Sequence, residues 1–296
     1  MIDRACISLN NNCNLRCRYC HFQDKQHDFT SFELSGLIEI IDNIHTYCEV
    51  NHIPAFKLGL VGSGEPMIKK NEIFALLDYI NSCEYAELKL YTITNGVLLS
   101  REDIERSYLY KDIINLCFSL DGYKELHNYG RAKHEELMTR IGWYWEIFGV
   151  SPSINATVNR LTYEKKEQVV SFFKENGLNN VTFSKLVGYF KSDLYITDEQ
   201  YSVFMEYARV SGLNSRQFSK EKKYDCTMYG RLCGVGRTNI FIAPEGIYPC
   251  GRFYKNDKYL LGTYNSPISE VEKKVLEMKP VSDGKCFYIE NVEVKK

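Results

Sequence analysis

Hydrophobic positions in the first two thirds of the chain follow two alternating periodicities. Short apolar runs end at turn residues, and between these runs apolar residues recur every three to four positions. The short runs predict strands at 4–9, 56–61, 87–94, 113–120, 153–158 and 180–186. The periodic stretches predict helices at 32–47, 71–80, 101–109, 135–148 and 163–176. Strict alternation of strand and helix predicts parallel strands covered by helices, so we expect an α/β fold with a partial (β/α)6 TIM-like barrel.

The pattern changes after about residue 194. One helix is predicted at 198–210, and a stretch rich in cysteine and glycine follows it. A hairpin is predicted around Pro244-Glu245-Gly246, because proline presets φ and glycine accepts a positive φ, and a last helix is expected at 269–277. We place the boundary between residues 190 and 225, and divide the chain into a barrel at 1–195 and a small Cys-rich α+β domain at 196–296.

Composition and charge narrow the class of protein. The 296 residues include 37 Lys and Arg against 38 Asp and Glu, and 44% of them are hydrophobic, as in ordinary globular proteins. Near-neutral charge argues against a protein that coats nucleic acid or binds anionic membranes. The chain has no apolar run long enough to span a membrane and no signal peptide at its start. We therefore expect a cytoplasmic protein that binds neither nucleic acid nor membrane.

The chain has 11 cysteines, and in a reducing compartment clustered cysteines are first interpreted as metal ligands or redox groups. Cys13, Cys17 and Cys20 form a C-x3-C-x2-C motif in a polar loop just after the first predicted strand. Three converging thiolates suit an iron–sulfur cluster or a soft metal. A closed [4Fe-4S] cluster takes four protein ligands, so three leave one iron open to a small molecule. The alternative is a zinc site completed by His21 or His27.

At these residues the sequence resembles the radical S-adenosylmethionine (SAM) superfamily, and Tyr19 supplies the aromatic residue that precedes the third cysteine of its motif. The resemblance implies a partial (β/α)6 barrel and a [4Fe-4S] cluster whose open iron is chelated by SAM. It also implies reductive cleavage of SAM to a 5′-deoxyadenosyl radical, which abstracts hydrogen from a substrate.

A second motif follows the second predicted strand. Gly62-Ser63-Gly64-Glu65-Pro66 resembles the GGEP segment of the same superfamily, with Ser63 in place of the first glycine. The resemblance implies that Gly64 and Glu65 bind the amino group of SAM, and a carboxylate suits an ammonium group. The alternative is a Gly/Pro turn with a solvated glutamate.

The fourth predicted strand ends in Ser119-Leu120-Asp121-Gly122, and His127 and Arg131 follow. This stretch resembles the peptide- and protein-modifying branch of the superfamily, in which Ser119 and Arg131 would hold the SAM carboxylate. Asp121 is our candidate catalytic residue through contact with substrate, and the alternatives are that it orders the loop or caps a turn with Gly122.

Two weaker cofactor contacts come from other strand ends. Asn95 after the third strand matches a T-N-G segment near SAM or substrate, and Leu186 at the end of the sixth strand lies where the superfamily places an adenine contact. Cys117 shares strand parity with Ser119, whereas the other isolated thiols are expected to be small core residues.

A second set of thiols, Cys226, Cys233, Cys250 and Cys286, lies in the C-terminal segment. With the Pro244 to Cys250 stretch these cysteines resemble a twitch or shortened SPASM domain, which implies one auxiliary [4Fe-4S] cluster. The alternative is a four-Cys structural zinc. Cys286 is the least constrained ligand, and without it the auxiliary cluster would have an open iron for substrate.

The resemblance implies a radical SAM oxidoreductase that crosslinks or oxidises a ribosomally made peptide. The alternatives are a small-molecule radical SAM dehydrogenase, a non-radical iron–sulfur electron-transfer protein and a zinc-binding module. A flavodoxin- or ferredoxin-type reductant is the implied electron donor. Because the cluster motif begins at Cys13, a peptide substrate would require a separate leader-binding partner or a leaderless mode.

Overall fold

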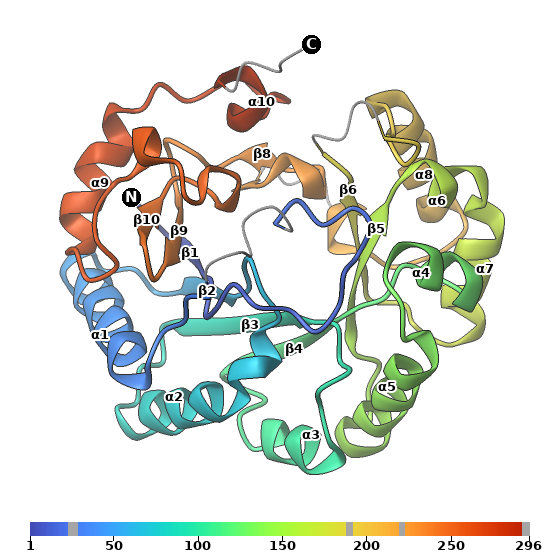
Figure 1. The fold of residues 1–296 in the computed structure, drawn as a ribbon, viewed down its shortest axis with the longest axis horizontal. Coiled ribbons are helices and arrows are strands. Elements are labelled where there is room, and N and C mark those ends of the chain that lie inside the picture. Colours follow the sequence, from blue (N-terminus) through green and yellow to red (C-terminus); the bar gives the residue numbers. More distant parts are fainter. Residues whose placement is uncertain (23–28, 188–191, 219–222, 292–296) are drawn as a thin grey trace.

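A computed structural model describes residues 1–22, 29–187, 192–218 and 223–291 of the chain (Figure 1). The strands are β1 (Arg4–Ile7), β2 (Phe56–Leu60), β3 (Leu88–Thr94), β4 (Ile114–Ser119), β5 (Ser153–Val158), β6 (Val181–Lys185), β7 (Tyr224–Asp225), β8 (Leu232–Cys233), β9 (Asn239–Ala243) and β10 (Gly246–Tyr248). The helices are α1 (Leu34–Asn51), α2 (Lys70–Ser82), α3 (Arg101–Tyr108), α4 (Lys124–Gly130), α5 (His134–Phe148), α6 (Arg160–Glu164), α7 (Lys166–Glu175), α8 (Asp198–Val210), α9 (Ile268–Glu277) and α10 (Phe287–Asn291).

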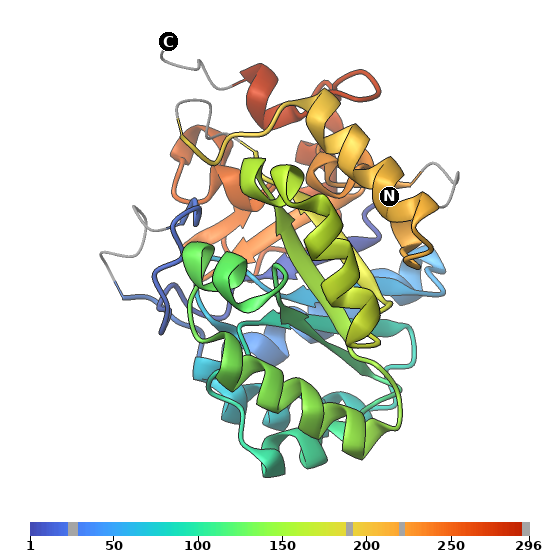
Figure 2. The same cartoon turned by 90° about the vertical axis from the view of Figure 1, so that its right-hand side faces the viewer.

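Eight strands form one curved sheet in the order β10-β9-β1-β2-β3-β4-β5-β6, and the helices surround it (Figures 1 and 2). Strands β1 to β6 are parallel in chain order, each joined to the next by a helical crossover. The predicted α/β fold with a partial barrel is therefore confirmed.

The C-terminal segment extends this sheet. Strand β9 pairs with β1 in parallel, from Arg4 opposite Asn239 to Ile7 opposite Ile242, and β10 returns antiparallel to β9. Helix α9 packs beside α1, where Asn43 donates to the Ser266 carbonyl oxygen at 2.8 Å. The division at residue 195 stays a prediction, and the two segments share one continuous sheet.

Alternation along the strands separates a packed outer face from the barrel interior. The outward residues of β4 and β5 are buried beneath the helices, and Leu116, Phe118, Ile154 and Ala156 are at most 5% exposed. Helix α1 contributes Leu37 and the neighbouring isoleucines to the same core. The inward positions carry smaller and more polar side chains.

The structure differs from the predicted elements at several places. Helix α4 was not predicted, because a seven-residue helix is too short to display a period. The stretch predicted as one helix at 163–176 contains two helices, which meet at Lys165 in a non-helical conformation. The strands β7 and β8 and helix α10 were also missed, and none of these elements exceeds five residues.

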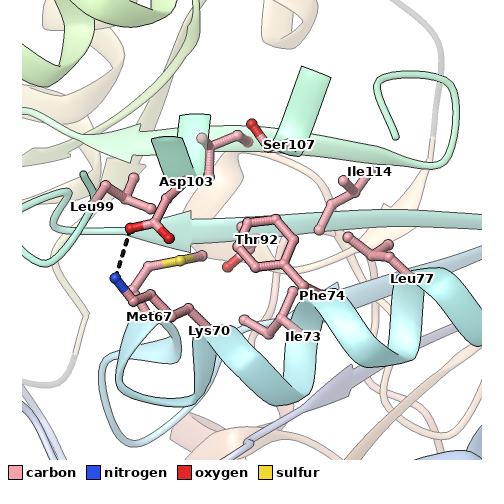
Figure 3. A pocket seen from close by; sticks show the side chains of 11 residues that line it. Met67, Lys70, Ile73, Phe74, Leu77, Thr92, Leu99, Asp103, Ser107 and Ile114 are labelled. Atoms are coloured by element: carbon pink, nitrogen blue, oxygen red, sulfur yellow. Dashed lines mark hydrogen bonds and ion pairs between the residues drawn. The ribbon is translucent and has the colours of Figure 1, made fainter. Parts of the chain in front are cut away.

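A small cavity of about 20 Å3 lies between α2, β3 and α3 (Figure 3). Apolar side chains such as Phe74 and Leu77 line it, and an ion pair joins Lys70 Nζ to Asp103 Oδ2 at 2.6 Å beside it. Its volume suits at most one water molecule, so we interpret it as a packing defect of the helix layer.

Among the described residues, no helix is both long and apolar enough to cross a membrane.

Candidate active site

The carboxyl ends of the parallel strands surround a cavity of about 220 Å3. Cys13, Cys17 and Cys20 of the loop after β1 all line it. The predicted SAM contacts line the same cavity, namely Tyr19, Gly64, Glu65, Asn95, Ser119, Arg131 and Leu186. The structure thus brings the N-terminal motif and the later strand ends, which are far apart in sequence, to one site.

Hydrogen bonds hold the segment that leads into the cysteine loop against the end of β2. Glu65 N donates to the Asn12 carbonyl oxygen at 2.7 Å, and Asn10 Nδ2 donates to the Glu65 carbonyl oxygen at 3.0 Å. Gly64 permits this approach, because a Cβ there would lie 2.7 Å from the Asn10 carbonyl oxygen and nearer still to that of Asn12. The glycine in this motif is therefore required by close packing against the cysteine loop.

Glu65 is 3% exposed, and its carboxylate accepts three protein hydrogen bonds. The donors are Thr94 Oγ1 at 2.5 Å, Asn95 N at 2.9 Å and Met67 N at 3.0 Å. Burial raises the pKa of Glu65, while these hydrogen bonds to the charged form oppose the rise. A carboxylate has about four acceptor sites, so one remains for a ligand. The solvated-turn alternative is wrong, because this side chain is buried.

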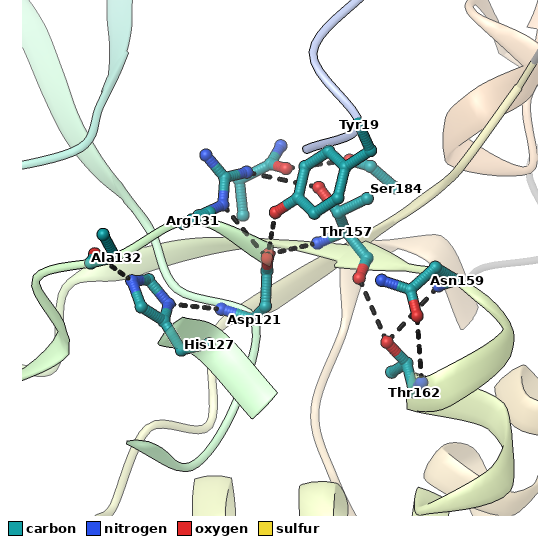
Figure 4. A network of polar contacts seen from close by, with 10 residues as sticks. Tyr19, Asp121, His127, Arg131, Ala132, Thr157, Asn159, Thr162 and Ser184 are labelled. Atoms are coloured by element: carbon teal, nitrogen blue, oxygen red, sulfur yellow. Dashed lines mark hydrogen bonds and ion pairs between the residues drawn. The ribbon is translucent and has the colours of Figure 1, made fainter. Parts of the chain in front are cut away.

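Asp121 is the centre of a polar network behind the cavity (Figure 4). Its Oδ1 accepts from Thr157 N at 2.8 Å, and its Oδ2 accepts from Arg131 Nε at 3.1 Å and from the Tyr19 hydroxyl. Asp121 is 2% exposed and is not among the described residues that line the cavity. This geometry supports the loop-ordering alternative for Asp121 in place of the catalytic one.

Arg131 is fixed in direction by its neighbours. Its Nη2 donates to Thr157 Oγ1 at 3.2 Å, and its guanidinium lies 5.3 Å from the centre of the Tyr19 ring. It also hydrogen-bonds the Cys17 sulfur. Burial lowers the pKa of Arg131, but the adjacent Asp121 carboxylate and other nearby groups outweigh this effect and raise the pKa well above its usual range, so a permanent cation faces the cavity.

His127 supports the same network from α4. Its Nδ1 accepts from Asp121 N at 3.3 Å, and its Nε2 lies 3.0 Å from the Ala132 carbonyl oxygen (Figure 4). Burial lowers its pKa to about 4, so the imidazole is neutral at pH 7. A neutral ring with its proton on Nε2 satisfies both contacts.

The thiols of the N-terminal motif suit a bound cation. Burial raises the pKa of Cys13 to about 11 and also raises that of Cys17. Such thiols ionise when a metal supplies positive charge, as a ligand thiolate does. Cys13 also accepts a hydrogen bond from the Leu15 backbone N–H. Hydrogen bonds to the sulfur ligands set the reduction potential of iron–sulfur clusters, so the chemistry of these thiols fits such a cluster.

No group of three or more His, Cys, Asp and Glu side chains among the described residues is arranged to hold one metal ion. An iron–sulfur cube differs from a single ion, since each of its thiolates binds a separate iron. Of the two histidines in the zinc alternative, His21 lines the cavity, and His27 lies outside the described residues.

The four C-terminal cysteines lie close to one another. The Cys286 thiolate charge contributes to raising the pKa of Cys226, Cys233 and Cys250, although burial is the larger cause at all three. These three sulfurs each accept a hydrogen bond from the backbone N–H two residues further on, as Cys13 does. A repeated N–H to sulfur turn is consistent with a second iron–sulfur site that includes Cys286.

One aromatic cluster contacts both sets of cysteines. Cys20 from the N-terminal motif and Cys233 and Cys250 from the C-terminal segment pack against it. Its buried residues are Phe22, Val235, Phe241, Ala243, Tyr248, Phe253, Tyr254 and Phe287.

The sequence motifs missed several polar residues of the cavity wall, including three from β5 and β6. Asn155, Thr157 and Ser184 line the cavity, and Ser184 Oγ donates to Asn155 Oδ1 at 2.8 Å. These residues belong to no motif. Along β5, Asn155 and Thr157 alternate with the buried Ile154, Ala156 and Val158. This alternation was the available signal, because it assigns Asn155 and Thr157 to the barrel interior.

No family model matches the chain. Among curated proteins, it is 35% identical to the GTP 3′,8-cyclase of Clostridium perfringens over 124 residues, which are 42% of this chain and 36% of that protein. It is 26% identical to the cysteine-type anaerobic sulfatase-maturating enzyme of Clostridium novyi over 186 residues, 58% of this chain and 48% of that protein. The match therefore spans less than two thirds of the length of either relative.

Solved structures match over most of the chain. The structure of native anSMEcpe with bound AdoMet has a TM-score of 0.75 at 19% identity, covering 90% of this chain and 79% of that one. Streptococcus suis SuiB bound to its precursor peptide SuiA has a TM-score of 0.68 at 17% identity, covering 92% and 64%. With the strand-end cavity described above, these likenesses confirm the resemblance indicated by the motifs: this chain has the fold of the radical SAM maturases.

Proposed function

We propose that this protein is a radical SAM enzyme that modifies a ribosomally made peptide. The observation that carries the proposal is the cavity at the carboxyl ends of the strands. Three cysteines, a buried carboxylate, a hydroxyl and a permanently charged guanidinium all line it. A bound [4Fe-4S] cluster and SAM would supply one-electron cleavage of SAM and, from it, a 5′-deoxyadenosyl radical that abstracts hydrogen from substrate.

The chain's own residues would bind and orient the cofactor. Cys13, Cys17 and Cys20 would hold the cluster. Glu65 has one free acceptor site for the SAM ammonium group, and Ser119 and Arg131 are suited to its carboxylate. Leu186 and Asn95 line the same cavity and would contact the rest of the nucleoside.

The cysteine triad provides the direct test. We expect the triple change Cys13→Ala, Cys17→Ala, Cys20→Ala to abolish formation of 5′-deoxyadenosine from SAM under reducing anaerobic conditions. Cys83→Ala is the matched control, since Cys83 lies at the end of α2 and does not line the cavity. Retained 5′-deoxyadenosine formation in the triple variant would contradict the proposal.

Two observations support a peptide substrate. SuiB, of similar fold, has been solved with its precursor peptide, and anSMEcpe with the Cp18Cys peptide. The second set of cysteines would hold an auxiliary cluster able to take up the electron left after hydrogen abstraction. The likeness to GTP 3′,8-cyclase favours a small-molecule substrate as the second candidate.

Fractionated cell extract separates these two candidates. Ultrafiltration of an extract of the source cells gives a peptide fraction and a small-molecule filtrate. We expect the peptide fraction to stimulate 5′-deoxyadenosine formation above the uncoupled rate. Stimulation by the filtrate alone would favour the small-molecule candidate.

A further inference from the structure

The barrel contains a second cavity, of about 430 Å3, at the opposite end of its strands. Lys57, Lys89 and Asn115 are the second residues of β2, β3 and β4, and Ser153 is the first residue of β5. All four line this cavity, so it occupies the barrel interior at the amino ends of the strands. We call it the lower cavity, and we call the cavity that carries the cysteine triad the upper cavity.

Many of the side chains that line this cavity are small or polar. The middle of a TIM barrel is ordinarily filled by branched apolar side chains from alternate strands. Here Gly59 takes one inward position, and the Tyr91 ring occupies the space over it, since a Cβ there would lie 2.6 Å from that ring. Cys117 and Asn155 take others. The sequence thus leaves an open space where packing would have stabilised the fold.

The two cavities are adjacent inside the barrel. Ile93 and Asn155 line both the cavity that carries the cysteine triad and the lower cavity. A molecule in the lower cavity that extends past these two side chains would therefore reach the site at which the proposed radical forms.

The lower cavity carries an excess of positive charge. Of the described residues that line it, Lys57, Lys89 and Arg231 are cationic and Asp225 is anionic. That carboxylate is already paired, with Arg4 Nη1 at 2.9 Å and Lys57 Nζ at 3.8 Å. Neither Lys89 nor Arg231 has an ion pair with any described residue. In addition, Lys57 and Lys89 are register partners on neighbouring strands, a like-charge pairing that destabilises a sheet unless an anion offsets it.

The neutral polar groups of the wall are preorganised. Asn115 Nδ2 and Asn180 Nδ2 both donate to Ser153 Oγ, at 3.1 and 2.9 Å. Gln217 donates to the carbonyl oxygens of Phe183 and Tyr229, at 2.7 and 2.9 Å. With these groups committed to one another, the cations are the charged groups left to recognise a ligand.

We propose that the lower cavity binds an anionic group of the substrate, a carboxylate or a phosphate, through Lys89 and Arg231. This inference rests on the proposed function and adds a substrate class to it. The anionic group would be anchored at the amino ends of the strands, while the reacting carbon reaches past Ile93 and Asn155 toward the cysteine triad.

Calorimetric binding to the anaerobically reconstituted protein tests this inference. The probes are the peptide Ala-Glu-Ala-Glu-Ala with both termini blocked, the same peptide with each Glu replaced by Gln, and inorganic triphosphate. We expect the acidic peptide or triphosphate to bind, and the double change Lys89→Gln, Arg231→Gln to weaken that binding by about tenfold or more, because charge-assisted contacts are lost. The probe that binds identifies the anion as carboxylate or phosphate.

The matched control is Lys273→Gln, Lys279→Gln, which removes the same charge from exposed positions in and after α9. It should leave probe affinity within about twofold, since distant surface charges are screened. A second variant, Asn115→Trp, fills the opening and should exclude the probe even if the double variant folds poorly. Equal binding of the Glu and Gln peptides without triphosphate binding, or full affinity in the Lys89/Arg231 variant, would overturn the inference.

Formation of 5′-deoxyadenosine without substrate separates the two proposals. It is measured on the wild-type protein and should be unchanged in the Lys273/Lys279 control, since neither of those side chains lines either cavity. If the wild-type protein cleaves SAM but binds neither the acidic peptide nor triphosphate, only the anion site is contradicted. If the wild-type protein does not cleave SAM, the proposed function is contradicted.

Discussion

The Asp121 carboxylate joins three parts of the upper cavity wall. It binds Arg131 after α4, the Thr157 backbone on β5 and the Tyr19 hydroxyl in the cysteine loop. We propose that Asp121 is a positioning residue, because it aims the Arg131 guanidinium at the cavity and at the Cys17 sulfur.

Asp121→Asn keeps the shape of the side chain and removes its charge. We expect SAM affinity to fall about tenfold, because the charged partner of Arg131 is lost. We also expect the free energy of unfolding to fall by about 3 kcal/mol, since a buried ion pair is left with one partner. Equilibrium binding and denaturant unfolding measure the two effects.

A readout at the cluster distinguishes positioning from stability alone. In Asp121→Asn the reduction potential of the N-terminal cluster should shift, because Arg131 no longer keeps its place beside Cys17. Asp193→Asn is the control, since Asp193 also accepts from a tyrosine and an arginine but is exposed. A variant with lowered stability and wild-type potential and SAM affinity would contradict the positioning role.

His127 makes stability depend on pH. Its pKa is lowered to about 4 in the fold, whereas the unfolded chain begins to bind this proton near pH 6.5. Because the unfolded state takes up the proton first, the contribution is present above the unfolded pKa and is lost as the pH falls. We expect about 2 kcal/mol of stability to be lost between pH 7 and pH 5 from this group.

His127→Gln should remove that part of the acid sensitivity. The measurement is the free energy of unfolding of wild type and variant at pH 7, 6 and 5, and the difference between the two chains should narrow as the pH falls. A difference that stays constant over this range would show that His127 does not titrate as its burial requires.

At the scale of elements, the loop after β2 depends on two glycines. A Cβ at Gly62 would lie 2.6 Å from the Ser8 Cα, and one at Gly64 would clash with backbone oxygens of the cysteine loop. The GSGEP segment thus acts as a packing surface as well as a ligand site.

Gly64→Ala should lower the free energy of unfolding by about 2 kcal/mol through overpacking, and should weaken SAM binding as the cysteine loop is displaced. Gly142→Ala is the matched control. Gly142 lies in α5, where nothing is within 4 Å of an added Cβ, so this change should stabilise the helix by about 1 kcal/mol. Unchanged SAM affinity in Gly64→Ala would contradict the close-packing argument.

The elements that the sequence predicts well are those in which the hydrophobic repeat continues over many residues. Helix α1 and the strands β2 to β6 follow from their apolar spacing, because burial imposes that spacing over many residues. Helix α4 carries His127 in the Asp121 network, yet it is held by tertiary contacts and its seven residues show no period. Motifs located the cysteines and Glu65, whereas the network around Asp121 depends on Thr157, which only the folded barrel brings near.

At the scale of the whole molecule, two clusters are expected from two sets of cysteines. Anaerobically reconstituted protein should hold about eight irons, as two cubane clusters. Cys250→Ala should lower this to about four and stop substrate turnover, with substrate-free SAM cleavage retained. Iron analysis and 5′-deoxyadenosine assay measure these outcomes, and Cys48→Ala, at a buried thiol of α1, is the control. Equal loss of both activities would assign the second site a structural role.

The pairing of β9 with β1 could not be predicted from local patterns. Ala5 lies 235 positions before its register partner Ile240, and contact between such distant segments leaves no periodicity. The same pairing connects the two proposed iron sites. Strand β1 leads into the first cysteine loop, and β9 leads through β10 to Cys250. Hydrogen bonds between neighbouring strands resist sliding of one strand past the other, so the fold would fix the length of the electron-tunnelling path between the two proposed clusters. The rate of tunnelling along that path would then not depend on hinge motion.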